Sequence, residues 1–176
     1  MEHTLAATNK MHYFAYGSNM LTVRLRERVA SAKPVGRASL RCHLLHFNKK
    51  GIDGSGKCDA FATGQERDII WGVLFDISTE EKHQLDEIEG LGSGYEIKRV
   101  NVELGSGNIQ SAFTYYATAT NSNLLPFEWY KAFVIAGAIE HRLPREYVNR
   151  LKRIRTQPDP QTDRQAANTR ILGLQS

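Results

Sequence analysis

The sequence predicts a single α+β domain with about five or six β-strands and three or four helices. The expected strands follow one another through short polar turns, and most connections are too short for the crossover helix that parallel neighbours need. A length of 176 residues fits one domain and can bury a core around a small pocket. We therefore expect an α+β fold rather than a doubly wound parallel sheet.

The chain divides into three segments by composition. Residues 1–10 are small and polar and predict a flexible arm, whereas residues 11–156 carry the patterned apolar positions of one domain. Residues 157–176 are polar, contain Pro158 and Pro160, and predict an extended tail. A last apolar cluster near residue 172 would let this tail dock on the domain or on a partner.

The overall composition is that of a soluble globular protein. Hydrophobic residues make up 41% and charged residues 24% of the chain, with a net charge of +4. No apolar run approaches the roughly 20 residues that cross a bilayer, and the first residues lack the basic and apolar regions of a secretory signal. We expect a cytoplasmic protein with no membrane partner.

Two cysteines and two histidines, residue types that can bind zinc, lie in or near the second expected strand. Cys42, His43 and His46 lie close in sequence, and Cys58 follows later. Their spacing matches no common zinc pattern, and no fourth ligand is evident. We therefore expect no metal site, with both cysteines as free thiols and the histidines as ordinary strand residues.

The first structured stretch is a strand, a tight turn and a helix. An aromatic run from Tyr13 to Tyr16 ends at Gly17, and an amphipathic helix is expected over Leu21–Arg28. Gly17 can adopt backbone angles closed to other residues, while Ser18 and Asn19 are favoured helix-capping types. Exposed N–H groups there could receive a carboxylate or phosphate, although a purely structural turn has the same pattern.

Further strands are expected from alternating apolar residues and turn signals. We predict a connection over Ala30–Gly36 and a glycine-rich loop over Lys49–Lys57 that could lie at a pocket mouth. The predicted strands are Ser39–Phe47, Cys58–Thr63, Ile69–Ile77, Tyr95–Leu104 and Ile109–Thr118.

A helix is expected between the third and fourth of these strands, over Thr79–Glu89. Ser78 followed by Glu81 matches a capping box, and Gly90 is a natural C-terminal stop. Leu85 and Ile88 would form its buried stripe.

Glu89 falls nearest to that stripe among the later acids of the helix. Both the helix dipole and the apolar surroundings disfavour its charged form. This environment is typical of a general acid or base. An idle, solvated acid at the helix end is the alternative.

Two helices are expected in the last third of the domain. Pro126 suits the first turn of a helix through Tyr130 to about His141, and Leu143-Pro144 precedes a second one. Basic residues cluster on and after the second helix, which favours a solvated face over a nucleic-acid patch. These residues are Arg150, Lys152, Arg153 and Arg155.

Two strings resemble the signatures of the γ-glutamylcyclotransferase family. They are YFAYGSNM, from Tyr13 to Met20, and LDEIEG followed by GY, which contains Glu89 and Tyr95. The resemblance implies a small mixed five- or six-stranded β-barrel with flanking helices. It also implies a substrate-binding role for Tyr13, Phe14, Ala15, Tyr16, Gly17, Ser18 and Asn19.

The same resemblance assigns the remaining site residues. Glu89 matches the catalytic acid/base, Tyr95 matches a tyrosine lying near it, and Tyr130 matches a tyrosine that contacts substrate. The implied partner is a small-molecule γ-glutamyl substrate, and neither a cofactor nor a nucleic acid is expected. The sequence leaves open whether the chain forms a homodimer.

The implied reaction is intramolecular aminolysis of a γ-glutamyl amide or peptide. The α-amine would attack its own side-chain carbonyl and give 5-oxoproline and a free amine or amino acid. The alternatives are a cyclotransferase for a γ-glutamylamine or another specialised metabolite, and a non-catalytic module that binds a metabolite. The leaving group and the donors that would stabilise the oxyanion are not assigned by the sequence.

Overall fold

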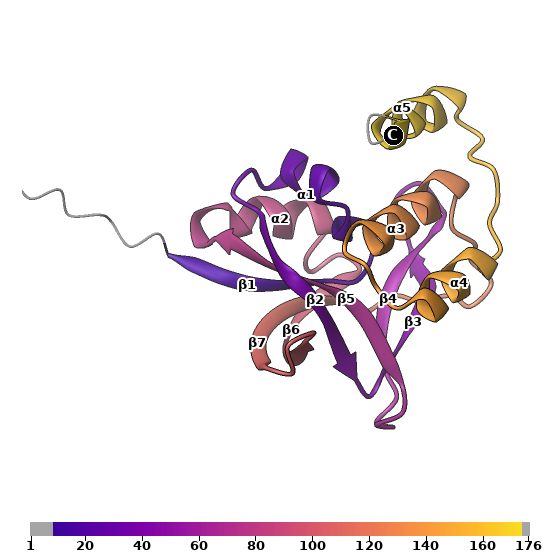
Figure 1. Cartoon of the computed structure of the whole chain (residues 1–176). Helices are drawn as coiled ribbons and strands as arrows, with labels where there is room; N and C mark the ends of the chain where they lie inside the picture. Colours follow the sequence, from indigo (N-terminus) through magenta and orange to yellow (C-terminus); the bar gives the residue numbers. More distant parts are fainter. Residues whose placement is uncertain (1–8, 174–176) are drawn as a thin grey trace, which may run out of the picture.

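The computed structural model describes residues 9–173, and its centre is a closed five-stranded barrel (Figure 1). Neighbouring strands run antiparallel except where β1 meets β7 in parallel, with Tyr13 opposite Phe113. The expected mixed barrel with flanking helices is therefore confirmed. In barrel order the strands are β1 (Lys10–Ala15), β5 (Ile69–Ser78), β2 (Lys33–Arg41), β6 (Tyr95–Leu104) and β7 (Ile109–Ala117).

A two-stranded sheet and several helices flank the barrel. Strands β3 (His43–Lys50) and β4 (Gly56–Ala62) form an antiparallel hairpin of their own. The helical segments are η1 (Ser18–Met20), α1 (Thr22–Arg28), η2 (Thr79–Glu81), α2 (Lys82–Glu89), α3 (Glu128–Glu140), α4 (Arg145–Arg153) and α5 (Thr162–Gly173).

The strand predicted over Ser39–Phe47 is in fact two strands. Cys42 separates β2 from β3 with a φ of 62°, a left-handed conformation that turns the chain out of the barrel. The preceding connection is also shorter than predicted, because β2 already begins at Lys33. Pro34 is tolerated there since the β2–β5 register shifts between Pro34 and Gly36.

The start of the η2–α2 segment differs from the expected capping box. The Ser78 hydroxyl accepts a hydrogen bond from the Glu80 backbone N–H at 3.3 Å. Glu81 does not reach back to Ser78. Its carboxylate accepts from the backbone N–H of Ser31 at 2.9 Å, which ties the helix to the chain after α1.

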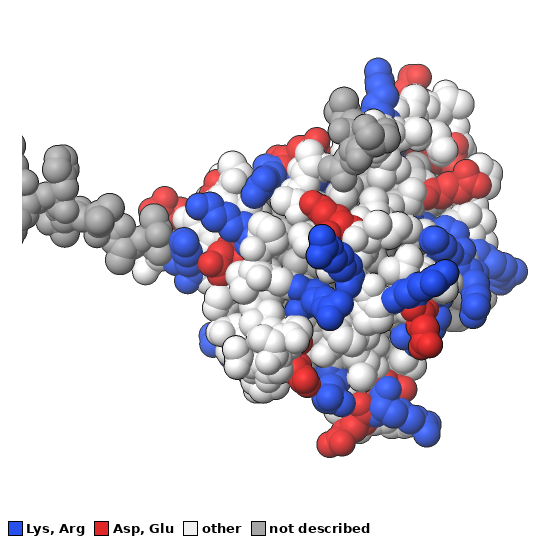
Figure 2. All heavy atoms as spheres, in the orientation of Figure 1, with Lys and Arg blue, Asp and Glu red and all other residues white. Residues whose placement is uncertain are grey.

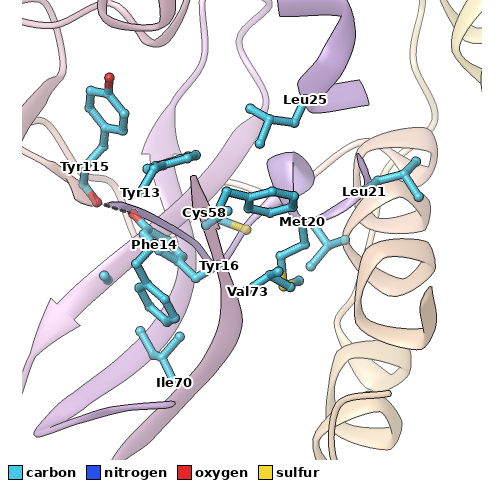
Figure 3. Close-up of a cluster of buried hydrophobic side chains, with 14 of the residues drawn as sticks. Tyr13, Phe14, Tyr16, Met20, Leu21, Leu25, Cys58, Ile70, Val73 and Tyr115 are labelled. Carbon is cyan, nitrogen blue, oxygen red and sulfur yellow. Dashed lines mark hydrogen bonds between the residues drawn. The ribbon is translucent and has the colours of Figure 1, made fainter. Parts of the chain in front are cut away.

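The core contains the aromatic end of β1. Phe14, Phe75 and Phe133 are completely buried, and Figure 3 shows Phe14 and Ile70 within the cluster of buried side chains. Because the β1 strand runs into this core, its end and the turn that follows are held in a fixed position.

The segment predicted as an extended tail contains helix α5. Asp159 anchors it to the domain, accepting from the Trp129 indole N–H at 2.8 Å and from the Arg164 guanidinium at 2.5 Å. Ile171 and Leu172 are half-buried and pack against the core, so the expected docking is observed up to there. Leu174 and most of the N-terminal arm, residues 1–8, lie outside the described residues.

Positive and negative side chains are mixed over the face shown in Figure 2, with basic ones gathered over α4.

None of the helices within residues 9–173 is both long enough and apolar enough to cross a membrane.

Gly137 permits the close packing of α3 on the turn after β1. A Cβ atom there would lie 2.6 Å from the Leu21 nitrogen and 2.6 Å from the Met20 Cβ. We therefore expect Gly137→Ala to lower the free energy of unfolding by about 1–3 kcal/mol. Gly36→Ala is the control, since its nearest atom would be 3.8 Å away. Equal denaturant midpoints for the two variants would contradict the prediction.

Candidate active site

Aromatic and polar side chains surround a small recess at the end of β1. Its volume is about 30 Å³, the space of roughly one water molecule. It is lined by Tyr13, Tyr16, Gly17, Ser18, Asn19, Cys58, Glu89, Tyr95, Tyr115 and Tyr130. Most of the residues predicted for the site therefore meet around one space, although they come from distant parts of the chain.

Two predicted residues do not line the recess. Phe14 and Ala15 are completely buried in the core, where the Phe14 carbonyl accepts from the Thr114 hydroxyl at 2.8 Å. The position of Phe14 follows from the alternation of a strand, since Tyr13 points to the recess and Phe14 to the opposite face. They support the site without reaching it.

Gly17 allows the neighbouring segments to approach the turn closely. Its φ of −111° is not the positive φ that favours glycine, although its ψ of −143° lies outside the usual β and α regions. A Cβ atom there would lie 3.1 Å from the Cys58 Cβ and 3.4 Å from the Tyr130 hydroxyl. The absence of a side chain lets the turn pack closely against β4 and α3.

Ser18 and Asn19 do not cap a helix through their side chains. The Asn19 amide nitrogen instead donates to the Glu89 carboxylate at 2.8 Å and to the Tyr13 hydroxyl at 3.0 Å. The turn is therefore joined directly to the end of α2.

Arg28 is the second partner of Glu89. Its guanidinium donates to Glu89 Oε1 at 2.9 Å and to the Asn19 amide oxygen at 2.9 Å. Both bonds to Glu89 reach the same oxygen. None of the hydrogen bonds described for residues 9–173 involves Glu89 Oε2, so this oxygen remains available to a ligand.

The end of α2 places Glu89 at the recess. Gly90 terminates the helix in the left-handed conformation, with a φ of 75°. Leu85 is buried as expected, but Ile88 is 49% exposed, so the predicted buried stripe is wrong at that position. The short helix packs only its first turns inward, and its last turn forms the rim of a cavity.

Most tyrosine hydroxyls of the recess already donate to protein acceptors. Tyr16 donates to the Tyr115 carbonyl at 2.6 Å, drawn as a dashed line in Figure 3. Tyr95 donates to the Cys58 carbonyl at 2.5 Å, and Tyr115 donates to the Asp86 carboxylate at 2.6 Å. These three side chains are therefore held rigidly.

Tyr13 differs from these three because its hydroxyl only accepts, from Asn19, and the Tyr130 hydroxyl likewise accepts from the Cys58 backbone N–H at 3.1 Å. Among the described residues no acceptor takes the Tyr13 proton. Burial raises the pKa of Tyr13, so the phenol stays neutral and can donate a hydrogen bond. Its ring stacks on Phe113 with centroids 5.2 Å apart, which fixes the direction of the hydroxyl.

A larger outer chamber of about 720 Å³ adjoins the recess. Ser18, Glu89, Tyr95 and Tyr130 line both spaces, so Glu89 lies where they join. The predicted loop over Lys49–Lys57 forms part of the chamber wall, and the segment after Asp159 forms another part. The remaining chamber residues are Arg24, Arg28, Glu87, Ile88, Gly90, Ser93 and Trp129.

Sequence reasoning missed Arg28, Cys58 and Tyr115. Arg28 is one of several basic residues in its helix, and no local pattern distinguishes it. Tyr115 follows from strand alternation only once the barrel register is known.

The cysteines and histidines considered as metal ligands lie apart. Cys42 is half-buried at the β2–β3 corner and Cys58 is buried at the recess, both as free thiols. His46 stacks on Phe61 with centroids 5.0 Å apart. Within residues 9–173 no three potential metal ligands come together.

The fold and the site together define a class of protein. A closed mixed barrel carries a recess with a carboxylate at its mouth, anchored through one oxygen and open at the other. Such a site can bind a small polar molecule and exchange a proton with it.

Comparison with known proteins identifies the family. The sequence model of the AIG2-like family matches residues 69–151. Gamma-glutamylcyclotransferases from Homo sapiens and Mus musculus are 36% and 35% identical to this chain over 146 residues, covering 81% of it and 77% of each relative. A solved gamma-glutamyl cyclotransferase structure superposes with a TM-score of 0.79 at 32% identity, over 85% of this chain and 90% of that one. The chain belongs to the γ-glutamylcyclotransferase family.

A double-mutant cycle can measure the coupling free energy between Arg28 and Glu89. The side chains are 22% and 15% exposed, so Arg28→Met should leave a largely buried carboxylate short of a partner. We expect it to lower the free energy of unfolding by about 1–3 kcal/mol. In a Glu89→Gln background the loss should be smaller by roughly 0.5 kcal/mol or more. Strict additivity in denaturant unfolding would refute the coupling.

Proposed function

We propose that this protein is a γ-glutamylcyclotransferase that uses Glu89 as its general acid and base. One observation carries the proposal: the Glu89 carboxylate is anchored through Oε1 at the mouth of the recess, while Oε2 has no described hydrogen-bond partner. The names of the relatives support the same activity.

The reaction requires one proton to move within the substrate. The α-amino nitrogen attacks the γ-carbonyl carbon, a C–N bond closes the five-membered ring, and the amide C–N bond to the leaving group breaks. An α-amine has a pKa near 8, so it must lose protons before and during attack. Glu89 Oε2 takes the proton from the attacking nitrogen and returns it to the leaving nitrogen. The products are 5-oxoproline and the free amine or amino acid.

The turn from Tyr16 to Asn19 would hold the glutamyl portion. The recess admits only a small group, so we place the α-carboxylate end there and the scissile amide beside Glu89. Holding the chain curled brings the nitrogen and carbon together, which can supply several kcal/mol of the barrier (about 7–11 at most).

Tyr13 is our candidate donor to the developing oxyanion. Its neutral hydroxyl lies beside Asn19, which also touches Glu89, and its proton has no described acceptor. Pre-oriented donors of this kind stabilise charge that appears only in the transition state. Backbone amides near Gly17 would supply a second donor.

Other expectations remain predictions. We also expect a cytoplasmic location and no binding of nucleic acid, and a homodimer is compatible with the proposed site. A specialised γ-glutamyl substrate would use the same chemistry and differ in the outer chamber.

Glu89→Gln should abolish the proton transfer while keeping the shape of the side chain. We expect kcat for 5-oxoproline release from γ-glutamyl-alanine to fall by about 10²-fold or more. Glu96→Gln, an exposed change on β6, is the matched control and should retain activity. A wild-type rate for the folded Glu89→Gln protein would remove Glu89 from the mechanism.

Tyr13→Phe should lower kcat by about 10²-fold with little change in KM, since it removes a donor to the transition state only. The ring stacking on Phe113 would be preserved. Tyr147→Phe, in a buried tyrosine of α4 that lines neither cavity, serves as the control. If both variants turn over at the wild-type rate, Tyr13 is not the oxyanion donor.

A further inference from the structure

The outer chamber carries more positive than negative side chains. Its basic residues are Arg24, Arg28, Lys49, Lys57 and Arg164, and its acidic residues are Asp53, Glu87 and Glu89. Three of the cations already have carboxylate partners: Arg28 with Glu89 at 2.9 Å, Lys57 with Asp53 at 2.7 Å, and Arg164 with Asp159 at 2.5 Å. The other two cations, Arg24 and Lys49, have no carboxylate partner among the described residues.

Lys49 is a buried cation without an acid partner. The residue is only 7% exposed, and its ammonium lies 4.5 Å from the centroid of the Tyr95 ring. Among residues 9–173, neither a hydrogen-bond acceptor nor a carboxylate at ion-pair distance serves this ammonium. Glu89 and Asp53 act on its charge only from further away, and burial lowers the pKa of Lys49.

Arg24 is the second unpaired cation of the chamber. Its guanidinium lies 4.2 Å from the Phe133 ring centroid and 5.9 Å from that of Trp129. Its Nε atom is buried, and within the described part of the chain nothing accepts its hydrogen. Burial lowers the pKa of Arg24 to about 10, which still leaves it charged at neutral pH.

Two unpaired cations in one cavity call for two anionic groups. A charge removed from water without a partner is costly, and the aromatic faces compensate only in part. A bound carboxylate would supply the missing acceptor for each cation. The chamber volume of about 720 Å³ lies within the usual range for small-ligand sites.

The position of the chamber decides which part of the substrate it holds. Glu89 lies at the junction, and in the proposed reaction it protonates the leaving nitrogen. Everything beyond that nitrogen must therefore extend into the chamber. Arg24 and Lys49 line the chamber and not the recess, so in this arrangement they lie on the side of the leaving group.

We propose that the outer chamber selects leaving groups with two carboxylates, so that the preferred substrates are γ-glutamyl dipeptides of glutamate or aspartate. Arg24 and Lys49 act as specificity-determining residues, each pairing with one carboxylate. A neutral amino acid would leave one cation unpaired, and an amine would leave both. This inference rests on the proposed cyclotransferase function.

The test compares γ-glutamyl-glutamate with γ-glutamyl-glutamine, which differ only by one carboxylate changed to an amide. We expect kcat/KM for 5-oxoproline release to be about 10-fold or more higher for the dicarboxylate, mainly through KM. Of Arg24→Gln and Lys49→Gln, the variant that removes the partner of the side-chain carboxylate should bring this ratio towards one. The other variant removes the partner of the α-carboxylate, so it should lower kcat/KM for both dipeptides by a similar factor. Arg24→Lys and Lys49→Arg keep the charges and should retain much of the preference. Arg150→Gln, on α4 outside the chamber, should leave the ratio unchanged.

A binding measurement separates this inference from the proposed function. Calorimetry with the Glu89→Gln protein compares the dissociation constants of the same two dipeptides without turnover. Tighter binding of the dicarboxylate, lost in one of the Arg24→Gln and Lys49→Gln backgrounds and accompanied by weaker binding of both dipeptides in the other, supports the subsite even if no dipeptide is cyclised. Equal affinities, or a ratio unaffected by both Gln variants, would overturn it. Failure of the wild-type protein to release 5-oxoproline from any γ-glutamyl compound would overturn the proposed function alone.

Discussion

The site depends on one contact among three side chains, in which Asn19 and Arg28 both donate to Glu89 Oε1. Arg28 also donates to the Asn19 amide oxygen, so the three groups form a closed set of hydrogen bonds. They come from η1, α1 and α2, and the contact therefore fixes the relative position of three segments. It also leaves the carboxylate with a defined orientation, which an acid at a helix end would otherwise lack.

The barrel makes this contact possible by holding the end of β1. The parallel pairing of Tyr13 with Phe113 closes the sheet, and α3 packs on the following turn at Gly137. The turn is therefore fixed on two sides before its side chains are considered. Because the turn is fixed, its hydrogen-bond donors need little rearrangement when charge develops on a bound substrate. Electrostatic preorganisation of a site requires such fixed donors.

Alternating apolar residues, turn residues and helix stops predict those elements of the fold that depend on neighbouring residues alone. The β6–β7 hairpin and the end of α2 at Gly90 are predicted correctly because alternation and turn residues are sufficient there. Arg28 could not be found, since its partner lies 61 residues away and any basic residue of α1 looks equivalent. The α5 helix was missed because its residues are mostly polar, with only Ile171 and Leu172 near its end packing against the core, and its anchor Asp159 precedes it.

The distribution of charge separates the two halves of the cavity. In the recess burial raises the pKa values of Tyr13, Tyr16, Tyr95 and Tyr130, so the tyrosines stay neutral. In the proposed mechanism this leaves Glu89 to exchange protons there. In the chamber the unpaired groups are cations, which cannot accept a proton at neutral pH. In the proposed mechanism Glu89 transfers the proton, whereas Arg24 and Lys49 of the chamber recognise charge. Leaving-group preference can therefore change through the chamber without altering the chemistry of the recess.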